Sequence, residues 1–393
     1  MRGGPLQPRT VLFLTGTRAD FGKLKPLILG AQAHAGLEAR VFATGLHMLA
    51  RYGSTVHEIE KAGCRSIYPY INQDGAISTQ MDIVLANTVN GLAHFVRECR
   101  PDLLVVHGDR VEALAGGIVG ALNNILVGHV EGGELSGTVD ELLRHAISKL
   151  AHVHFVANDE ARGRLVQMGE EPDSIFVIGS PDIDIMLSGS LPSPEEVRAK
   201  YDIPFADYVI LLYHPVTTEP HTLRARTRSL LAGLRTSGRN VVALYPNNDT
   251  GAEQIIEELQ LFARQPQVRL LPSMRFEYFL SLLRHADAIV GNSSAGIREA
   301  PVYGIPTVNV GTRQTDRFAG PSIVNIPEEP GAVARALHHL PARTPPSYHF
   351  GRGNSVALFL AALTGDALWA RSPQKHFRDL ATQAPADAAG VAV

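Results

Sequence analysis

Short apolar runs recur along the chain, and most are followed by a stretch with helical periodicity. In the first half they are TVLFLTG, EARVFATG, PDLLVVHGD, ILVGHVEGG, HVHFVAND and SIFVIGSPD. A second series consists of YVILLYHP, NVVALYPNND, VRLLPS, ADAIVGNSS, IPTVNVGTRQ and SIVNIPEE. These runs are apolar without alternation, which is typical of strands buried on both faces of a parallel sheet. The pattern predicts an α/β protein with two doubly wound, Rossmann-like domains.

The two series are separated by SGSLPSPEEVRAKYDIPFADY, a stretch rich in Ser, Pro and Gly that reads as a linker with one short helix. We therefore predict an N-terminal domain over 1–187 and a second domain over 188–350. Residues 351–380 are expected to form terminal helices that pack back on the first domain. The last stretch, 381–393, consists mostly of small residues and is poor in large apolar ones, and it is expected to be a disordered tail.

Composition narrows the class of protein. The chain has 393 residues, 45% of them hydrophobic and 19% charged, which suits a globular protein with two domains. The formal net charge of -3 gives no bulk attraction to nucleic acid or to an anionic membrane. Cys64 and Cys99 are the only cysteines, too few for a disulfide scaffold or a structural zinc site. With no signal segment or membrane span in the pattern, we expect a cytoplasmic protein.

Polar side chains gather where the predicted strands end. Because ligands bind at the carboxyl ends of parallel strands, these side chains would line one cleft if the two halves face each other. Any one of them alone is equally well a turn residue. The residues are Arg18, Asp109, Arg110 and Glu131 in the first half and His214, Asn247, Ser293, Ser294 and Arg313 in the second.

Two of these turns have the chemistry of an anion site. TGTRADFGKLKP is neither a G-x-G-x-x-G fingerprint nor a P-loop, but Arg18 and Lys23 at a helix start oppose the helix dipole unless an anion is present. We expect them to reach a diphosphate; an ordinary strand–helix connection is the alternative. GNSSAGIREAPVYGIP offers Ser293, Ser294 and free N–H groups at a predicted helix start, which suits phosphate. Glu299, two turns further in, suits ribose hydroxyls.

Histidines are frequent, and one of them follows a predicted strand of the second half. His214 is either a core histidine or a residue that holds phosphate charge or transfers protons near neutral pH. The first half is crowded with His107, His129, His145, His152 and His154, but no spacing typical of a metal site supports a metal, and none is expected.

Together the motifs TGTRADFGKLKPL, HGDRVEALAG, HVEGGELSGTVDE, HPVTTE, YPNNDTG, GNSSAGIREAP and VGTRQTDR resemble the hydrolysing UDP-N-acetylglucosamine 2-epimerases of bacterial sialic acid and capsule synthesis. They run in order from residue 15 to residue 317. The resemblance implies a glycosyltransferase-B type fold with UDP-sugar between the domains, no cofactor, and a homo-oligomer, dimer or tetramer. It implies that UDP-N-acetylglucosamine and water give UDP and N-acetylmannosamine.

The chemistry implied by the family has two steps, elimination of UDP to a 2-acetamidoglucal and then hydration. Asp109, Glu131 and Asp140 match the family's catalytic acidic positions, and Asp109 or Glu131 is favoured for proton transfer at C2. Close carboxylates in a partly dry cleft are expected to raise one pKa and so divide acid from base. Asp140 is also a residue that a helix dipole alone would favour. Glu134 and Glu141 are ranked lower, since they do not fall on the family's positions.

By the same resemblance, other positions serve binding. Arg18, His214 and Arg313 would stabilise the departing diphosphate, Ser293, Ser294 and Glu299 would hold phosphate and ribose, and Asn247 and Met274 would lie near the nucleotide. Non-hydrolysing relatives carry Glu where Asp140 stands, and the shorter side chain would leave room for water. The alternatives are a hydrolysing 2-epimerase of a UDP-2,4-diacetamido-trideoxyhexose, a glycosyltransferase, and a nucleotide-sugar binding module without catalysis.

Overall fold

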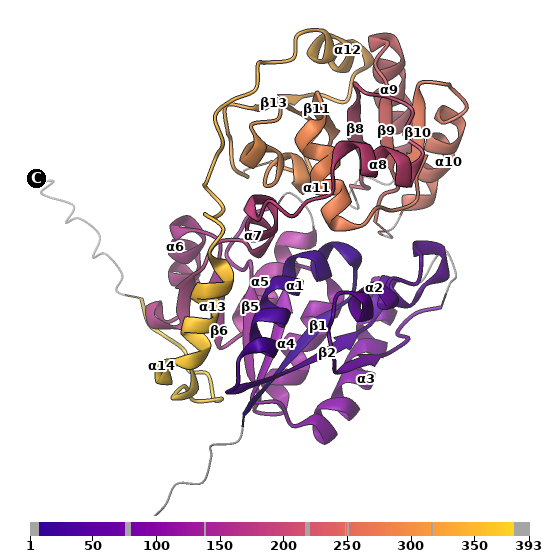
Figure 1. Ribbon diagram of the computed structural model, residues 1–393. Helices are drawn as coiled ribbons and strands as arrows, with labels where there is room; N and C mark the ends of the chain where they lie inside the picture. The colour runs from indigo at the N-terminus through magenta and orange to yellow at the C-terminus, as the bar shows by residue number, and fades with distance from the viewer. Residues whose placement is uncertain are drawn as a thin grey trace, which may run out of the picture.

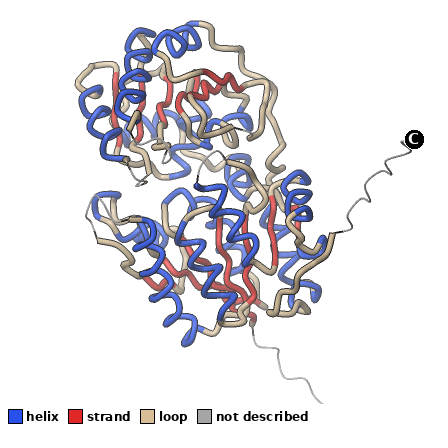
Figure 2. The backbone as a smooth tube through the Cα atoms, turned by 180° about the vertical axis from the view of Figure 1, so that it is seen from behind, coloured by secondary structure: helices blue, strands red, loops and turns tan. Residues whose placement is uncertain are grey.

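The chain folds into two α/β domains in the computed structural model, which describes residues 8–74, 80–136, 139–216, 221–247, 249, 251–315 and 317–380. Figure 1 shows the domains as two lobes, each with its sheet covered by helices, and Figure 2 shows the same layers from behind. The predicted fold class is confirmed. The tail predicted over 381–393 lies outside the described residues. None of the described helices is long and apolar enough to cross a membrane.

The first domain is built on a seven-stranded parallel sheet of order β3-β2-β1-β4-β5-β6-β7. Its strands are β1 (Arg9–Thr15), β2 (Leu37–Ala43), β3 (Ile67–Pro69), β4 (Leu103–His107), β5 (Leu126–Val130), β6 (Val153–Val156) and β7 (Ile175–Val177). Its helices are α1 (Arg18–Ala33), α2 (Val56–Lys61), α3 (Met81–Cys99), α4 (Val111–Leu122), α5 (Val139–Leu150), α6 (Asp159–Gln167) and α7 (Pro181–Leu187). The strand order reverses between β1 and β4, which places a ligand crevice at their carboxyl ends.

The second domain repeats this plan with a six-stranded parallel sheet of order β10-β9-β8-β11-β12-β13. Its strands are β8 (Val209–Leu212), β9 (Val241–Leu244), β10 (Val268–Leu271), β11 (Ala288–Gly291), β12 (Thr307–Val310) and β13 (Ile323–Ile326). Its helices are α8 (Pro194–Tyr201), α9 (Leu223–Ser237), α10 (Ala252–Phe262), α11 (Phe276–His285) and α12 (Pro330–His338). Here the strand order reverses between β8 and β11.

Two parts of the first domain differ from the sequence pattern. The stretch after β2 does not form one helix: it makes the 3-10 turns Gly45–Met48 and Ala50–Tyr52 before α2, because Gly53 takes a left-handed φ of +90°. The pattern also missed β3 and the whole of α3. The strand β3 has only three residues, and α3 follows it without an intervening apolar strand run.

The chain returns to the first domain at its C-terminal end. Helices α13 (Ser355–Thr364) and α14 (Asp366–Trp369) lie against the first lobe in Figure 1. Phe359, Leu363 and Leu368 are buried there in the core that α1 shares with the first sheet. The boundaries at 187 and 350 stay predictions.

One glycine at the carboxyl end of β11 is required by the close approach of two strands. Gly291 has a φ of +127°, and a Cβ built on it would lie 1.9 Å from the carbonyl oxygen of Leu212. We expect Gly291→Ala to lower the free energy of unfolding by roughly 3 kcal/mol or more, through strain and overpacking together. Gly63→Ala is the matched control, since Gly63 also has a left-handed φ, of +92°, but meets no atom within 4 Å. Equal losses in urea unfolding would contradict this account.

A buried carboxylate after α6 ties the C-terminal segment to the first domain. Glu170 is 1% exposed and accepts hydrogen bonds from His154 at 3.0 Å and Lys149 at 2.8 Å, and it pairs with Lys375 at 2.6 Å. Lys375 also donates to the carbonyl oxygens of Lys149 (2.8 Å) and Ala151 (2.7 Å) at the end of α5. Burial alone would raise the pKa of Glu170, but His154 and the two lysines outweigh it and lower the pKa to about 2.

This contact predicts a pH-dependent stability. The pKa of Glu170 is lower in the folded chain than the ordinary 4.5, so its stabilisation is complete above pH 4.5 and is lost as the pH falls towards 2. We expect Glu170→Gln to cost about 3 kcal/mol of unfolding free energy at pH 7, and the difference from wild type to shrink below pH 4.5. Glu171→Gln, a change at an exposed neighbour, should cost far less. A difference that stays constant in urea titrations from pH 7 to pH 3 would contradict the assignment.

Candidate active site

A cavity of about 320 Å³ lies between the two domains, at the carboxyl ends of both sheets. That volume is in the range of small-ligand sites. The cavity brings together every site residue predicted from the sequence. They are Arg18, Lys23, Asp109, Arg110, Glu131, Asp140, His214, Asn247, Met274, Ser293, Ser294, Glu299 and Arg313.

Glu131 is the most enclosed of the three predicted catalytic carboxylates. It follows β5 with a left-handed φ of +63°, unusual for a non-glycine residue, and is 3% exposed. Its Oε2 lies 3.1 Å from Nε2 of His107, and its Oε1 lies 2.6 Å from Arg298. Burial would raise the pKa of Glu131, but the charges of Arg298 and Lys23 outweigh it and hold the pKa well below the usual range.

Asp109 follows β4 and Gly108, whose φ is +73°. Its Oδ2 accepts a hydrogen bond from Arg144 of α5. The same guanidinium donates to the backbone carbonyl of Glu131 at 3.0 Å, so one arginine orients the ends of two neighbouring strands. Burial would raise the pKa of Asp109, but Arg144 and Arg317 lower it below the ordinary value.

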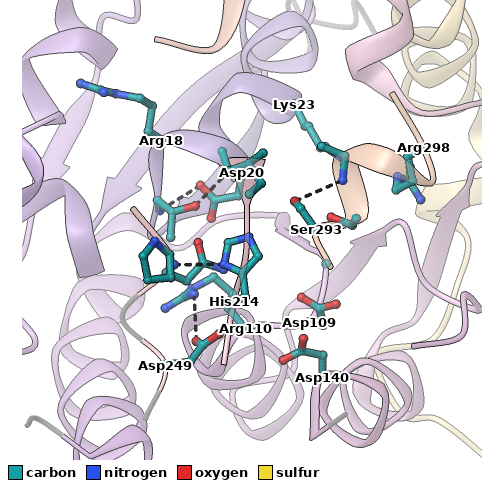
Figure 3. Close-up of a pocket in the computed structure, with 18 of the residues that line it drawn as sticks. Arg18, Asp20, Lys23, Asp109, Arg110, Asp140, His214, Asp249, Ser293 and Arg298 are labelled. Carbon is teal, nitrogen blue, oxygen red and sulfur yellow. Dashed lines mark hydrogen bonds and ion pairs between the residues drawn. The ribbon is translucent and has the colours of Figure 1, made fainter. Parts of the chain in front are cut away.

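Asp140 lies in the first turn of α5 and pairs across the cleft with Arg313 of the second domain, at 2.9 Å. Figure 3 shows Asp109 and Asp140 together on one side of the pocket, and both line a small annex of about 20 Å³. The carboxylates of the first domain therefore face the diphosphate-binding candidates of the second.

A carboxyl group with a raised pKa is present, but it is not one of the three predicted catalytic residues. Burial raises the pKa of Glu299 to about 7, even though Lys23 lies 3.3 Å from its Oε1. Asp109 and Glu131 both have lowered pKa values instead. The expectation that crowding raises the pKa of one catalytic carboxylate is wrong for these two residues, because each is paired with its own arginine.

The two cations of α1 do not both point at an open anion site. Arg18 donates to Ser273 at 2.6 Å and to Glu58 at 2.7 Å, and in Figure 3 it extends away from the centre of the pocket. Lys23 lies between Glu131, Asp182 and Glu299, at 3.5, 3.5 and 3.3 Å. A diphosphate was predicted because two cations at a helix start oppose the helix dipole. In the structure, acidic side chains already balance both positive charges.

The predicted helix start after β11 is not an α-helix. The segment forms the 3-10 turns Ser294–Gly296 and Ala300–Tyr303, with Glu299 capping the second. Pro301 has no backbone N–H, so an α-helix running through this segment would lack a hydrogen bond there, and Gly304 ends the second turn with a φ of +65°. Ser293 caps the first turn by accepting from the N–H of Ala295 at 3.3 Å. The two hydroxyls therefore meet the pocket from a tight turn, without a helix dipole behind them.

His214 is held as a neutral ring. Its Nδ1 accepts a hydrogen bond from the N–H of Asn247 at 3.2 Å, and Asn292 bonds its backbone on both sides, at 2.7 and 2.9 Å. Burial, with the charge of Arg313, lowers the pKa of His214 to about 3. Its burial and backbone hydrogen bonds fit the core histidine of the two alternatives, and its role towards phosphate stays a prediction. The ring can offer a neutral N–H to an anion.

Two further predicted residues lie at the edge of the cavity. Arg110 caps α4, with its Nε 3.2 Å from Glu112 and one terminal nitrogen 3.9 Å from Asp249, a contact drawn in Figure 3. Met274 is buried and packs in the second-domain core with Phe276. It therefore belongs both to this core and to the wall of the pocket.

Sequence reasoning missed five ionisable residues that contact the predicted ones or act on their charge. His107 ends β4, so the strand-end argument could have found it, and Arg144 lies one helical turn after Asp140. Arg298 and Arg317 carried no local signal, because their relation to the first-domain carboxylates depends on how the domains meet. Asp182 of α7 carried none either, because its contact with Lys23 depends on how α7 packs beside α1. Glu134, which was ranked lower, also pairs with Arg298 and Arg144.

Two doubly wound domains that face each other across a charged cleft define the glycosyltransferase-B class of fold. Residues 30–364 match the family described as UDP-N-acetylglucosamine 2-epimerase. The chain belongs to this family.

Individual relatives agree with this assignment. The chain is 45% identical to a UDP-N-acetylglucosamine 2-epimerase of Neisseria meningitidis, over 95% of this chain and 99% of that protein. It is 34% identical to the UDP-N,N'-diacetylbacillosamine 2-epimerase (hydrolyzing) of Legionella pneumophila, over 84% and 88%. The crystal structure of the Methanocaldococcus jannaschii UDP-GlcNAc 2-epimerase in complex with UDP-GlcNAc and UDP has a TM-score of 0.76 at 20% identity, covering 90% and 99%. At that identity the likeness concerns the fold.

Proposed function

We propose that the chain is a hydrolysing UDP-N-acetylglucosamine 2-epimerase, which converts UDP-N-acetylglucosamine and water to N-acetylmannosamine and UDP for sialic acid synthesis. The observation that carries the proposal is that Asp109, Glu131 and Asp140 of one domain line the same cleft as Ser293 and Arg313 of the other. An elimination needs both halves: a carboxylate near C2 and a site for the departing diphosphate. The 45% identity to the Neisseria UDP-N-acetylglucosamine 2-epimerase supports epimerisation at C2 of this UDP-sugar.

In the proposed first step a carboxylate of the first domain takes the C2 proton, the C1–C2 double bond forms, and the electron pair of the C1–O bond leaves with UDP. In the second step water adds across the double bond, with its oxygen at C1 and a proton at C2 on the opposite face. The lowered pKa values of Glu131 and Asp109 keep both carboxylates ionised near neutral pH, and these two residues are the candidate bases. Asp140 would then orient the water or the glucal.

We assign the diphosphate to the Ser293–Ser294 turn, His214 and Arg313. Arg313 is paired with Asp140 at 2.9 Å, so a bound diphosphate would compete with that carboxylate for the guanidinium. Nucleotide binding would then release Asp140 towards the sugar. Glu299 has a raised pKa, and as an acid or a carboxylate it can bond ribose hydroxyls.

The proposal is tested by incubating the chain with UDP-N-acetylglucosamine and recording NMR spectra of the sugar released. We expect N-acetylmannosamine and one equivalent of UDP. UDP-N-acetylmannosamine without free UDP would indicate a non-hydrolysing enzyme, and no UDP release at all would favour a binding module. A glycosyltransferase would release UDP efficiently only with an added acceptor.

A second substrate is favoured by a specific similarity, the 34% identity to the Legionella enzyme named for UDP-N,N'-diacetylbacillosamine. Fold, mechanism and most site residues would be shared with the first proposal. Parallel assays of the two UDP-sugars, compared by kcat/KM, decide between them.

We also propose a cytoplasmic homo-oligomer, and light scattering after gel filtration gives its subunit number.

A further inference from the structure

An arginine of the second domain reaches into the acidic group of the first. Arg298, between the two 3-10 turns after β11, is 3% exposed. One terminal nitrogen lies 2.6 Å from Oε1 of Glu131 and 2.7 Å from the hydroxyl of Ser180, and the other bonds Glu134. All three partners precede α8, the first helix of the second domain, so the guanidinium is a contact between domains.

The guanidinium is also held from a second side. Its central carbon lies 4.6 Å from the ring centroid of Phe350, in the segment that returns the chain to the first domain. The carbonyl of Phe350 accepts from the N–H of Ser180 at 2.6 Å, which joins the two segments that cross between domains. Arg298 therefore sits where the domains are connected, with its terminal nitrogens already directed at Glu131 and Glu134. This distinguishes it from Arg313, whose partner Asp140 lies across the open cleft.

Several charges act on the same carboxylate. His107 lies 3.1 Å and Lys23 3.5 Å from Oε2 of Glu131, whereas Arg298 contacts Oε1, and burial of the group opposes its charge. Arg298 is the largest favourable influence on the charged form of Glu131. The titratable and charged residues that act on Glu131 or Arg298 from the neighbouring elements are Lys23, His107, Glu134, Arg144, Asp182, Glu299, Arg317 and His349.

Resting on the proposed function, we propose that Arg298 is a positioning residue that fixes the Glu131 carboxylate from the opposite domain and keeps it in the charged form. It acts through Glu131 and not on the diphosphate. Loss of its charge should let Glu131 take a proton at a higher pH and lose the fixed orientation of its Oε1. Nucleotide binding, which uses the Ser293 turn and Arg313, should change little.

The first test compares pH profiles of kcat/KM for wild type, Arg298→Gln and Arg298→Lys, with UDP affinity from calorimetry. For Arg298→Gln we expect the acidic midpoint to move up by ~1–2 pH units, because one opposite charge within contact distance is lost. Arg298→Lys should return the midpoint most of the way to wild type, and all three proteins should bind UDP similarly. Arg335→Gln, a change on the exposed face of α12, is the matched control and should leave the profile unchanged.

An unmoved acidic midpoint in Arg298→Gln overturns the proposal, as does a loss of UDP affinity without a shift, which would make Arg298 a nucleotide ligand. A lysine variant that fails to restore the midpoint also overturns it.

Carbon-13 NMR titration of the Glu131 carboxyl, assigned with Glu131→Gln, needs neither turnover nor a folded arginine variant. In wild type it should titrate well below an ordinary glutamate, and a midpoint at or above the ordinary value rejects the proposal. A low midpoint in a protein without turnover would reject the proposed function alone.

Discussion

Replacing Asp109 by asparagine is expected to lower kcat by roughly 10²- to 10⁴-fold while UDP still binds. The carboxylate of Asp109 lines the pocket beside Asp140, and Arg144 keeps it ionised and oriented. Asparagine keeps the shape but can neither accept a proton nor balance the arginine. The measurement is UDP release from UDP-N-acetylglucosamine, with UDP affinity determined separately by calorimetry.

Asp207→Asn serves as the control for this change, because Asp207 is exposed on the second domain and lies outside the pocket. It should retain wild-type turnover. Turnover by Asp109→Asn at the wild-type rate would remove Asp109 from the chemistry. A parallel loss of UDP affinity and of folding would instead mean that its pairing with Arg144 is chiefly structural.

Replacing Arg313 by methionine is expected to weaken UDP binding roughly 10- to 150-fold, the range for losing one charge-assisted hydrogen bond. Arg313 lies in the pocket with one terminal nitrogen 2.9 Å from Asp140 and the other 3.4 Å from the carbonyl of Asn292. The change removes a cation from the proposed diphosphate site and leaves Asp140 without this partner. Calorimetry with UDP and with uridine separates an effect on the diphosphate from an effect on the shape of the cleft, since only UDP carries the diphosphate.

The expected pattern is a large loss for UDP and little change for uridine. Arg235→Met, on the exposed last turn of α9, should change neither affinity. Equal losses for UDP and uridine would place the effect of Arg313 on the shape of the cleft and would contradict its assignment to the diphosphate.

The strands and the cleft were predictable because they rest on local signals. Buried parallel strands read as continuous apolar runs, and a doubly wound sheet brings their carboxyl ends to one edge. This is why Asp109, Glu131, His214 and Ser293, far apart in the sequence, were all expected to line the cavity that the structure contains.

Other features depend on tertiary structure, and the sequence pattern did not reveal them. The segment around Glu299 has the capping residues of a helix start, but Pro301 interrupts it, and two short turns form in place of one helix. The charge states depend on partners contributed by both domains: Lys23 and Arg298 keep Glu131 ionised, and burial raises the pKa of Glu299. The spacing of residues along the sequence does not predict ion pairs between the two domains. The cross-domain contacts of Arg298 are therefore a result of the structure alone.

The central claim is that carboxylates on one domain remove a proton from C2 of a sugar whose diphosphate is held by the other. It is tested most directly by running the reaction in D2O and analysing the released sugar by NMR and mass spectrometry. The account predicts N-acetylmannosamine that carries one deuterium at C2, with an equal amount of UDP. Release of a sugar that keeps its original C2 hydrogen, or of N-acetylglucosamine, would show that the bond to UDP breaks without chemistry at C2, and would contradict it.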